Sequence, residues 1–283
     1  MTIELGANRY GKAAIRLVKV DRGRDRHRVR DLTVGVTLEG DFGAAHTEGD
    51  NALVVTTDTM KNTVYAFAPE HLTGAIESFG RVLAEHFLGF AQVELAAISI
   101  REHRWTPMPT VAGPAPDAFV RAGDLTRLAI VGAARGRPPT VEAGLEDLTV
   151  MKTARSAFSG FPRDRYTTLP ETEDRIMATR VSATWRYAPG DRDWDAAFDG
   201  VRATLLDALA EHDSRSVQHS IWVVGRTILE RHEAVEEIRM ALPNLHHWTV
   251  DVGRFGVEHA GGVFVATSEP HGLIEATVRR TAG

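Results

Sequence analysis

Two stretches of the sequence alternate between apolar and polar residues, as a half-buried β-strand does. In residues 32–38 every second residue is Leu or Val, and threonines stand on the other parity. In residues 181–187, Val, Ala, Trp and Tyr alternate with Ser, Thr and Arg. Successive side chains of a strand point to opposite faces, so each strand is predicted to bury one face. This pattern is typical of antiparallel sheets.

A third strand is predicted where the apolar parity changes part-way along. Val93 and Leu95 occupy odd positions, whereas Ile98 and Ile100 occupy even ones. One extra residue in a strand moves all later side chains to the other face. We therefore predict a β-bulge near residues 96–97.

Three stretches carry apolar residues three or four positions apart, the spacing of a helix that buries one face. The third of these helices is predicted to run from Val217 to Leu242. The stripes are Leu72, Ile76, Phe79, Leu83 and Phe87; Trp194, Phe198, Val201, Leu205 and Ala208; and Ile221, Val224, Ile228, Val235 and Ile238.

The elements follow one another in an order that repeats. The first half is predicted to contain strands at 9–21 and 27–42, helices at 57–67 and 69–89, and strands at 91–106 and 117–134. The second half is predicted to contain strands at 140–155 and 173–188, helices at 192–212 and 216–242, and strands at 245–254 and 261–280. Two ββααββ units, residues 1–136 and 137–283, predict an α+β fold with helices on one face of each antiparallel sheet. Open sheet edges favour closure with further copies of the chain, so we expect an oligomer.

Composition narrows the class of protein. The 283 residues are 43% hydrophobic and 25% charged, which is typical of globular domains. A net charge of −5 argues against nucleic acid as a partner. The basic run at residues 22–30 is flanked and interrupted by aspartates, so we interpret it as a solvated hairpin connection rather than a binding patch.

The chain has no cysteine, which excludes disulfides, thiolate metal sites and cysteine nucleophiles. Its first residues contain no apolar stretch typical of a signal peptide, and no run approaches membrane-spanning length. The last residues, RRTAG, differ from a Ser-Lys-Leu peroxisomal address. We therefore expect a cytoplasmic protein of bacterial type that does not contact membranes.

Residues 54–65, VVTTDTMKNTVY, place small hydroxyls where a strand-like run becomes a helix. Thr56, Thr57 and Asp58 are all suitable N-cap residues. The same geometry aims other backbone N–H groups at whatever lies in front of the helix. The stretch is therefore either a cap alone or a cap that also holds a ligand.

Several further motifs occur in a fixed order. They are Arg9-Tyr10-Gly11-Lys12, Asp58 to Thr63 (DTMKNT), His103-Arg104-Trp105, Ser156-x-Phe158-x2-Phe161-x4-Tyr166-x2-Leu169-x5-Arg175, Ser216-Val217-Gln218, and Leu242-Pro243-Asn244-Leu245-His246. From Arg9 to the C-terminal strand, the chain resembles the urate oxidase (uricase) family. The pattern in residues 148–175 is long and specific, while the shorter motifs gain weight from their order.

The resemblance implies the tunnelling fold, in which dimers close a barrel and two barrels stack into a homotetramer. It implies an active site between subunits. One chain would supply Lys12, Thr57 and Asp58, and its neighbour Phe158, Leu169, Arg175, Val217, Gln218, Asn244 and His246. It also implies oxidation of urate by O2 and water to 5-hydroxyisourate and hydrogen peroxide, with O2 as co-substrate and with neither cofactor nor metal.

The chemistry of these residue types suits that reaction. The Arg175 fork and the Gln218 amide match the acceptor and lactam edge of a purine, and Phe158 offers a stacking face. Leu169 and Val217 are expected to fill the wall. At the opposite edge, the Thr57 hydroxyl and the Asp58 backbone N–H would meet the five-membered ring. Lys12, Thr57 and His246 resemble the family's proton relay, and Asn244 would hold O2.

Each residue taken alone also has a structural interpretation. Lys12 could be a solvated charge, Phe158 a core residue, Arg175 a surface ion-pair partner and Gln218 a helix-start residue; Thr57 could be only a cap. His246 and His247 are adjacent on a predicted strand and should face opposite sides, which argues against a two-histidine metal site. For His103-Arg104-Trp105 we expect a structural network.

Two other functions stay open. Pterin and GTP enzymes of the tunnelling fold bind similar rings, but their zinc-dependent members use cysteine and histidine ligands. The second alternative is a purine-binding module that has lost catalysis. Loss of Lys12 or Thr57 would mark such a module, and both residues are present.

Overall fold

The computed structural model describes residues 2–258 and 262–281. The chain forms two compact units, one made of residues 1–144 and 186–198 and the other of residues 145–185 and 199–283. The division of the chain into two repeats, residues 1–136 and 137–283, stays a prediction.

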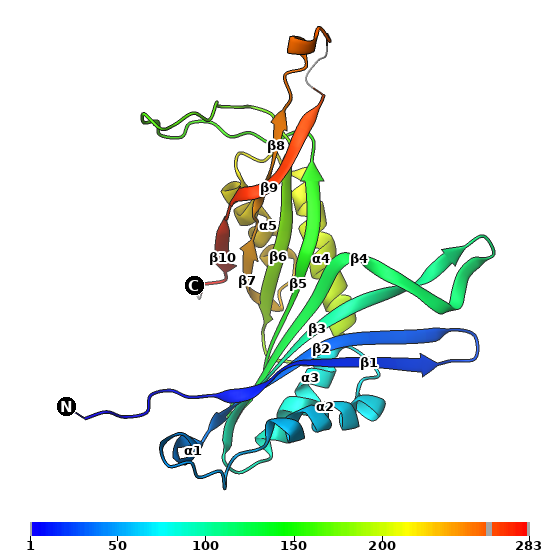
Figure 1. Ribbon diagram of the computed structural model, residues 1–283, viewed down its shortest axis with the longest axis vertical. Coiled ribbons are helices and arrows are strands. Elements are labelled where there is room, and N and C mark those ends of the chain that lie inside the picture. Colours follow the sequence, from blue (N-terminus) through cyan, green and yellow to red (C-terminus); the bar gives the residue numbers. More distant parts are fainter. Residues whose placement is uncertain (1, 259–261, 282–283) are drawn as a thin grey trace. The chain divides into compact units, whose positions relative to one another are not determined.

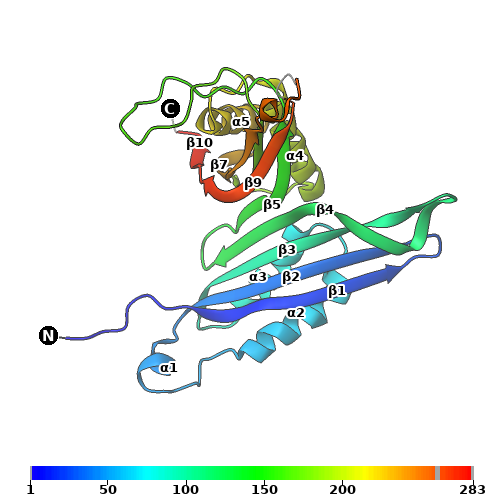
Figure 2. The same cartoon turned by 45° about the horizontal axis from the view of Figure 1, so that its top comes forward.

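The first unit is an antiparallel sheet with helices on one face (Figure 2). Its strands are adjacent in the order β1-β2-β3-β4. The elements are β1 (Tyr10–Arg22), β2 (His27–Gly40), α1 (Gly43–Thr47), α2 (Thr57–His71), α3 (Ile76–Leu88), β3 (Val93–Thr110) and β4 (Gly113–Ala134). The chain turns sharply from β1 into β2, where Arg22 pairs with His27, which confirms the predicted hairpin.

The predicted burial patterns of this unit are confirmed. Leu32, Val34, Val36 and Leu38 of β2 are all at most 1% exposed, and the five residues of the first helical stripe are fully buried. The helix boundaries differ from the prediction. Pro69 belongs to α2, and α3 begins only at Ile76, because Leu72 ends α2 with its N–H bonded to the Ala68 carbonyl.

The bulge predicted near residues 96–97 lies slightly earlier in β3. Leu95 pairs with Glu39 and Val93 pairs with Gly40, so Glu94 is the extra residue. Gly40 is required at this point, because a Cβ there would lie 2.0 Å from the Gln92 carbonyl oxygen.

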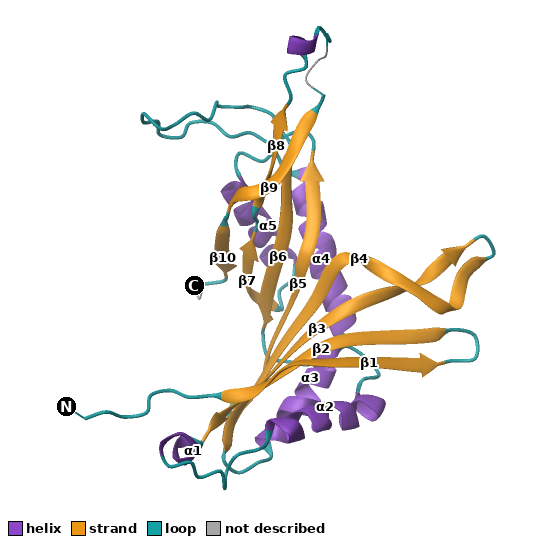
Figure 3. Cartoon of the chain, in the orientation of Figure 1, coloured by secondary structure: helices purple, strands orange, loops and turns teal. Residues whose placement is uncertain are grey.

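The second unit has the same layers (Figure 1 and Figure 3). The elements are β5 (Thr140–Lys152), β6 (Met177–Tyr187), α4 (Trp194–Glu211), α5 (Val217–Arg231), β7 (Val235–Ala241), β8 (Asn244–Thr249), a 3₁₀ turn (Gly253–Phe255), β9 (Phe264–Gly272) and β10 (Glu275–Arg279). Strands β5, β6, β7 and β10 are adjacent in that order, and β8 pairs with β6 and β9. The alternation predicted for residues 181–187 is confirmed, since its four apolar side chains are at most 4% exposed.

The helix predicted over residues 216–242 is wrong in its second half. α5 ends at Arg231, and β7 begins four residues later, at Val235. Val235 and Ile238 are buried in this strand. Their separation of three residues fits a helix, but Ile238, Met240 and Leu242 continue with the alternation of a strand. The second unit therefore repeats the helix-to-strand connection of the first.

Two arginines show this repeat at the level of side chains. Arg135 follows β4, donates from Nε to the carbonyl of Val93 at 2.9 Å, and donates from Nη2 to carbonyls at the end of α3. Arg280 follows β10, donates from Nε to the carbonyl of Val235 at 3.0 Å, and donates from Nη2 to the carbonyl of Leu229 near the end of α5. Each arginine thereby satisfies the carbonyls that a helix end leaves open.

A buried carboxylate organises the hairpins of the first unit. Asp31 is 5% exposed, pairs with Arg16, and accepts a hydrogen bond from Trp105 Nε1 at 3.0 Å. His103 Nε2 lies 2.8 Å from the hydroxyl of Thr33 on the neighbouring strand. The structural network predicted for His103-Arg104-Trp105 is therefore present, with His103 and Trp105 as its members.

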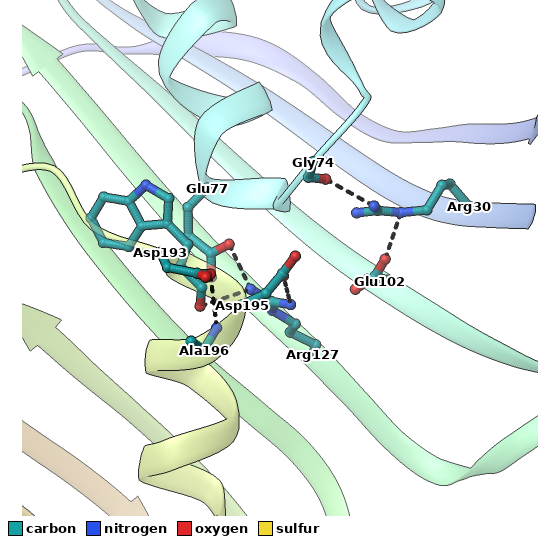
Figure 4. Close-up of polar contacts among 9 residues, drawn as sticks. Arg30, Gly74, Glu77, Glu102, Arg127, Asp193, Asp195 and Ala196 are labelled. Atoms are coloured by element: carbon teal, nitrogen blue, oxygen red, sulfur yellow. Dashed lines mark hydrogen bonds and ion pairs between the residues drawn. The ribbon is translucent and has the colours of Figure 1, made fainter.

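A second buried network joins α3, β4 and the start of α4 (Figure 4). Arg127 Nη2 lies 2.8 Å from Glu77 Oε2, and Arg127 Nη1 lies 2.6 Å from Asp195 Oδ1. The side chains of Glu77 and Arg127 are at most 5% exposed. Burial raises the pKa of Glu77, while the charge of Arg127 opposes that rise. The charge of Arg127 thus favours the ionised carboxylate against the effect of burial.

Arg127→Met should lower the free energy of unfolding by about 3–5 kcal/mol near pH 7, because Glu77 would stay buried without a counter-charge. The loss should shrink near pH 5, because a carboxyl whose pKa is raised in the folded state is destabilising above that pKa and harmless once protonated. Urea denaturation at the two pH values measures both effects. Arg81→Met, which removes a pair with the exposed Asp191, is the matched control and should cost less than about 1 kcal/mol. Equal losses in the two variants would contradict the assignment.

Candidate active site

A cavity of about 400 Å³ lies within the second unit, a size in the usual range for small-molecule sites. Five of the residues predicted for the site line it, namely Phe158, Leu169, Arg175, Asn244 and His246. The rest of the lining is Thr153, Pro170, Thr172, Asp174, Ile176, His247, Trp248, Thr249 and Phe264.

Arg175 and Phe158 form the cationic and aromatic part of this lining. The Arg175 guanidinium carbon lies 5.2 Å from the centre of the Phe158 ring. On the described chain, the buried Nε of Arg175 has no hydrogen-bond partner. Burial lowers the pKa of Arg175, although an arginine stays charged at any physiological pH. Arg175 therefore gives the cavity lining a fixed positive charge, which suits a planar anion with acceptors along one edge.

Backbone hydrogen bonds hold these two residues in place. The Arg175 N–H donates to the Ser156 carbonyl at 2.8 Å, and Phe158 and Thr172 exchange two bonds at 2.8 and 3.0 Å. The Ala157 N–H donates to the Ser214 carbonyl at 2.7 Å. Three chain segments that are distant in sequence are thereby joined at Ser156, so the positions of Phe158 and Arg175 do not depend on a flexible loop alone.

One face of β8 supplies the polar end of the cavity. Asn244 Nδ2 lies 3.4 Å from His246 Nδ1, and the His246 ring stacks on Trp248 at 5.2 Å with an interplanar angle of 21°. Burial, followed by the positive charges of Arg175 and His271, lowers the pKa of His246. The imidazole is therefore neutral near pH 7 and can accept a proton.

Two residues of this strand that line the cavity were not predicted from the sequence. Trp248 was not predicted, although it shares the parity of Asn244 and His246 and could have been found by extending the alternation. His247 was expected to face away, yet it lines the same cavity, with its Nδ1 3.0 Å from the Leu245 carbonyl oxygen. Strand alternation alone therefore does not separate the two histidines.

Val217 and Gln218 lie outside this lining, at the first turn of α5. Ser216 is the N-cap, and its hydroxyl accepts a hydrogen bond from the His219 N–H at 3.0 Å. Val217 is buried and Gln218 is exposed. The backbone pairing of Ser214 with the segment that leads to Phe158 connects this helix start to the cavity region.

Lys12, Thr57 and Asp58 come together in the first unit. Lys12 directly precedes a bulge in β1, where it pairs with Val36 while Ile15 pairs with Val34. The extra residue brings half-buried Lys12 and buried Ile15 to the same face. A hydrogen bond from Lys61 is the main cause that lowers the pKa of Asp58, and the nearby charge of Lys12 acts in the same direction.

The helix that begins at Thr57 is capped by its neighbour. Thr56 is the N-cap, and its hydroxyl accepts a hydrogen bond from the Thr59 N–H at 3.0 Å. Thr57 and Asp58 are the first two helical residues, so their N–H groups have no acceptor one turn earlier in the helix. The Thr57 hydroxyl is thus not needed for capping, which favours the interpretation of this stretch as a cap that also holds a ligand.

The described residues contain neither a metal-binding cluster nor a membrane-spanning helix. In residues 2–258 and 262–281 there is no cluster of three or more His, Cys, Asp or Glu side chains arranged to hold a metal ion. No helix in the same part of the chain has the length and apolarity needed to span a bilayer.

Comparison with known proteins gives a consistent result. The family model described as Uricase matches residues 8–132 and 141–275. The chain belongs to the uricase family. It is 46% identical to a uricase of Arthrobacter globiformis, in an alignment that covers 98% of this chain and 90% of that protein. It is 36% identical to a uricase of Aspergillus flavus, in an alignment that covers 98% of this chain and 97% of that protein. The crystal structure of the A. globiformis uricase matches with a TM-score of 0.94 and covers 100% of this chain and 97% of that one.

Membership in the uricase family confirms the predicted α+β class and tunnelling fold. Of the residues predicted for the site, the structure brings five together in one cavity and places the other five at two helix starts and at the β1 bulge. Their individual roles stay predictions.

Thr56→Ala should lower the free energy of unfolding by about 1 kcal/mol, because it removes the cap of α2. Thr57→Val should change stability by less than about 0.5 kcal/mol, because the hydroxyl it removes does not cap the helix. Denaturant titrations of the two variants measure the difference. If Thr57→Val proved the more destabilising, Thr57 and not Thr56 would be the capping residue.

Proposed function

We propose that the protein oxidises urate with O2 and water to 5-hydroxyisourate and hydrogen peroxide, without a cofactor. Membership in the uricase family supports the reaction. The observation that carries the proposal is the half-buried Arg175 guanidinium beside Phe158 in a cavity that also contains Asn244 and His246. This arrangement provides charge, a stacking surface and a proton acceptor in one small volume.

Urate is a flat anion with two carbonyls on its six-membered ring and a third on the five-membered ring. Arg175 would donate from Nε and Nη to the six-membered ring edge, and Gln218 would pair its amide with the adjacent lactam. Phe158 would stack on the ring. Leu169 and Val217 would exclude water around it.

The chemical task of the protein is then to remove a proton and to stabilise charge. Loss of a second proton makes urate a stronger reductant, so the substrate itself can supply both electrons to O2. Lys12, Thr57 and His246 would move the protons, and the neutral state of His246 fits this role. Asn244, adjacent to His246, would hold first O2 and then the attacking water.

We also propose that the active site forms between subunits. Lys12, Thr57 and Asp58 would meet the five-membered ring from one chain, and the cavity residues would hold the six-membered ring from its neighbour. A homotetramer built from two barrel-forming dimers would satisfy this requirement and close the exposed strand edges. A cytoplasmic location and the division into repeats 1–136 and 137–283 belong to the same proposal.

The decisive experiment adds purified protein to urate in air, without cofactor, and follows urate absorbance and hydrogen peroxide. We expect equimolar urate loss and peroxide formation, and elemental analysis of the active protein should find no metal in proportion to activity. Activity that tracks bound metal would overturn the cofactor-free mechanism. Tight urate binding without turnover would instead favour the inactive purine-binding module.

Lys12→Met should reduce kcat by about 100-fold or more, because it removes a proton carrier while keeping the length of the side chain. KM should change by less than about threefold, because Lys12 does not grip the six-membered ring. Steady-state kinetics measures the two constants separately. A variant that stays fully active would remove Lys12 from the relay.

A further inference from the structure

His212 forms a polar connection that the proposed reaction does not use directly. Its Nδ1 lies 2.7 Å from the Ala208 carbonyl oxygen, and its Nε2 lies 2.9 Å from the Ser220 hydroxyl. A carbonyl only accepts, so Nδ1 carries the ring proton and Nε2 accepts from Ser220. Burial lowers the pKa of His212, which favours this neutral form.

The connection continues to the start of α5. The Ser220 hydroxyl lies 2.8 Å from that of Ser214, and both lie within 3.2 Å of the Ser216 carbonyl oxygen. Ser214 and Ser220 are 3% and 0% exposed. Because Ser220 donates its one hydroxyl proton to His212, Ser214 is left to donate either to the Ser220 oxygen or to the Ser216 carbonyl. Buried hydroxyls that lose a partner are costly, so the bond between Ser220 and His212 matters for both serines. Ser220 lies in the first turn of α5, and its bond to His212 therefore holds that turn in place.

His212 is itself held firmly at the end of α4. Lys152 donates a hydrogen bond to its carbonyl. Arg155 donates to the carbonyls of Glu211 at 2.8 Å and Ala210 at 2.5 Å. The imidazole thus projects from a capped helix end, and the serines link it to the helix start that carries Gln218.

We propose that His212 is a positioning residue for urate: through its bond to Ser220 it holds the first turn of α5, so that the Gln218 amide meets the six-membered ring. This inference rests on the proposed function. His212 contacts neither substrate nor the reacting atoms, so it sets the affinity for urate and leaves the proton relay intact.

Three variants test this role by calorimetric titration with urate under anaerobic conditions and by steady-state kinetics in air. His212→Ala should raise both Kd and KM about fivefold to tenfold and leave kcat within about twofold. Ser220→Ala, a nearly isosteric change, should do the same. His212→Gln keeps an acceptor for the Ser220 hydroxyl and should restore most of the affinity.

His232 supplies a matched control in the same unit. Its Nε2 lies 2.8 Å from the Thr204 hydroxyl, so it also links α4 to α5, but it does so at the far end of α5. Burial lowers its pKa as well. His232→Ala should lower the melting temperature about as much as His212→Ala and leave Kd unchanged.

A double-mutant cycle separates positioning from general destabilisation. If His212 acts through Gln218, then His212→Ala should weaken urate binding much less in a Gln218→Ala background than in the wild type. Equal Kd values for His212→Ala and His232→Ala, or fully additive effects in the cycle, would overturn the inference while leaving the proposed function standing. A wild-type protein that neither binds nor oxidises urate would overturn the proposed function and this inference with it.

Discussion

The cavity depends on the backbone pairing at Ser156. The Arg175 N–H donates to the Ser156 carbonyl, and the residues on either side of Ser156 exchange bonds with Ser214. An arginine and a phenylalanine far apart along the chain are thereby held at a fixed separation, with a guanidinium over an aromatic face. A long side chain such as arginine loses much rotamer entropy when it is fixed. Anchoring its backbone, together with partial burial against the ring, reduces the entropy that a ligand would have to remove on binding.

In both units an arginine donates hydrogen bonds to carbonyls that are left unpaired at a helix C-terminus. Arg135 and Arg280 each follow the last strand of a four-stranded order and donate to the end of a helix and to the first residue of the next strand. Gly80 and Gly225 add a second parallel, since a Cβ at either would lie within 3.0 Å of a valine on the strand below. These correspondences occur although the two halves of the chain show no evident sequence identity. The arrangement of layers therefore constrains individual side chains even where most of the sequence is free to vary.

Much of the fold could be predicted because buried side chains recur along the sequence with the period of the strand or helix that carries them. The alternation around Leu32 and the stripe around Phe79 require only neighbours along the chain. The prediction failed after Arg231, where Val235 and Ile238 fit the helical and the extended period equally well. The cavity was predictable in part, since the 148–175 motif carries Phe158 and Arg175. The backbone hydrogen bonds around Ser156 and Ser214 could not be predicted, because they join segments far apart in the sequence and leave no local pattern.

The candidate binding residues at the two helix starts share one geometry. Thr57 and Asp58 follow the cap Thr56, and Val217 and Gln218 follow the cap Ser216. In both helices the cap hydroxyl satisfies the third N–H, which leaves the first two N–H groups and the positive end of the helix dipole directed outward. The helices are not equivalent in the repeat, since α2 is followed by a further helix, α3, whereas α5 is followed directly by strand β7. The shared feature therefore does not follow from the repeated architecture, and under the proposed function each helix start would face one edge of the purine anion.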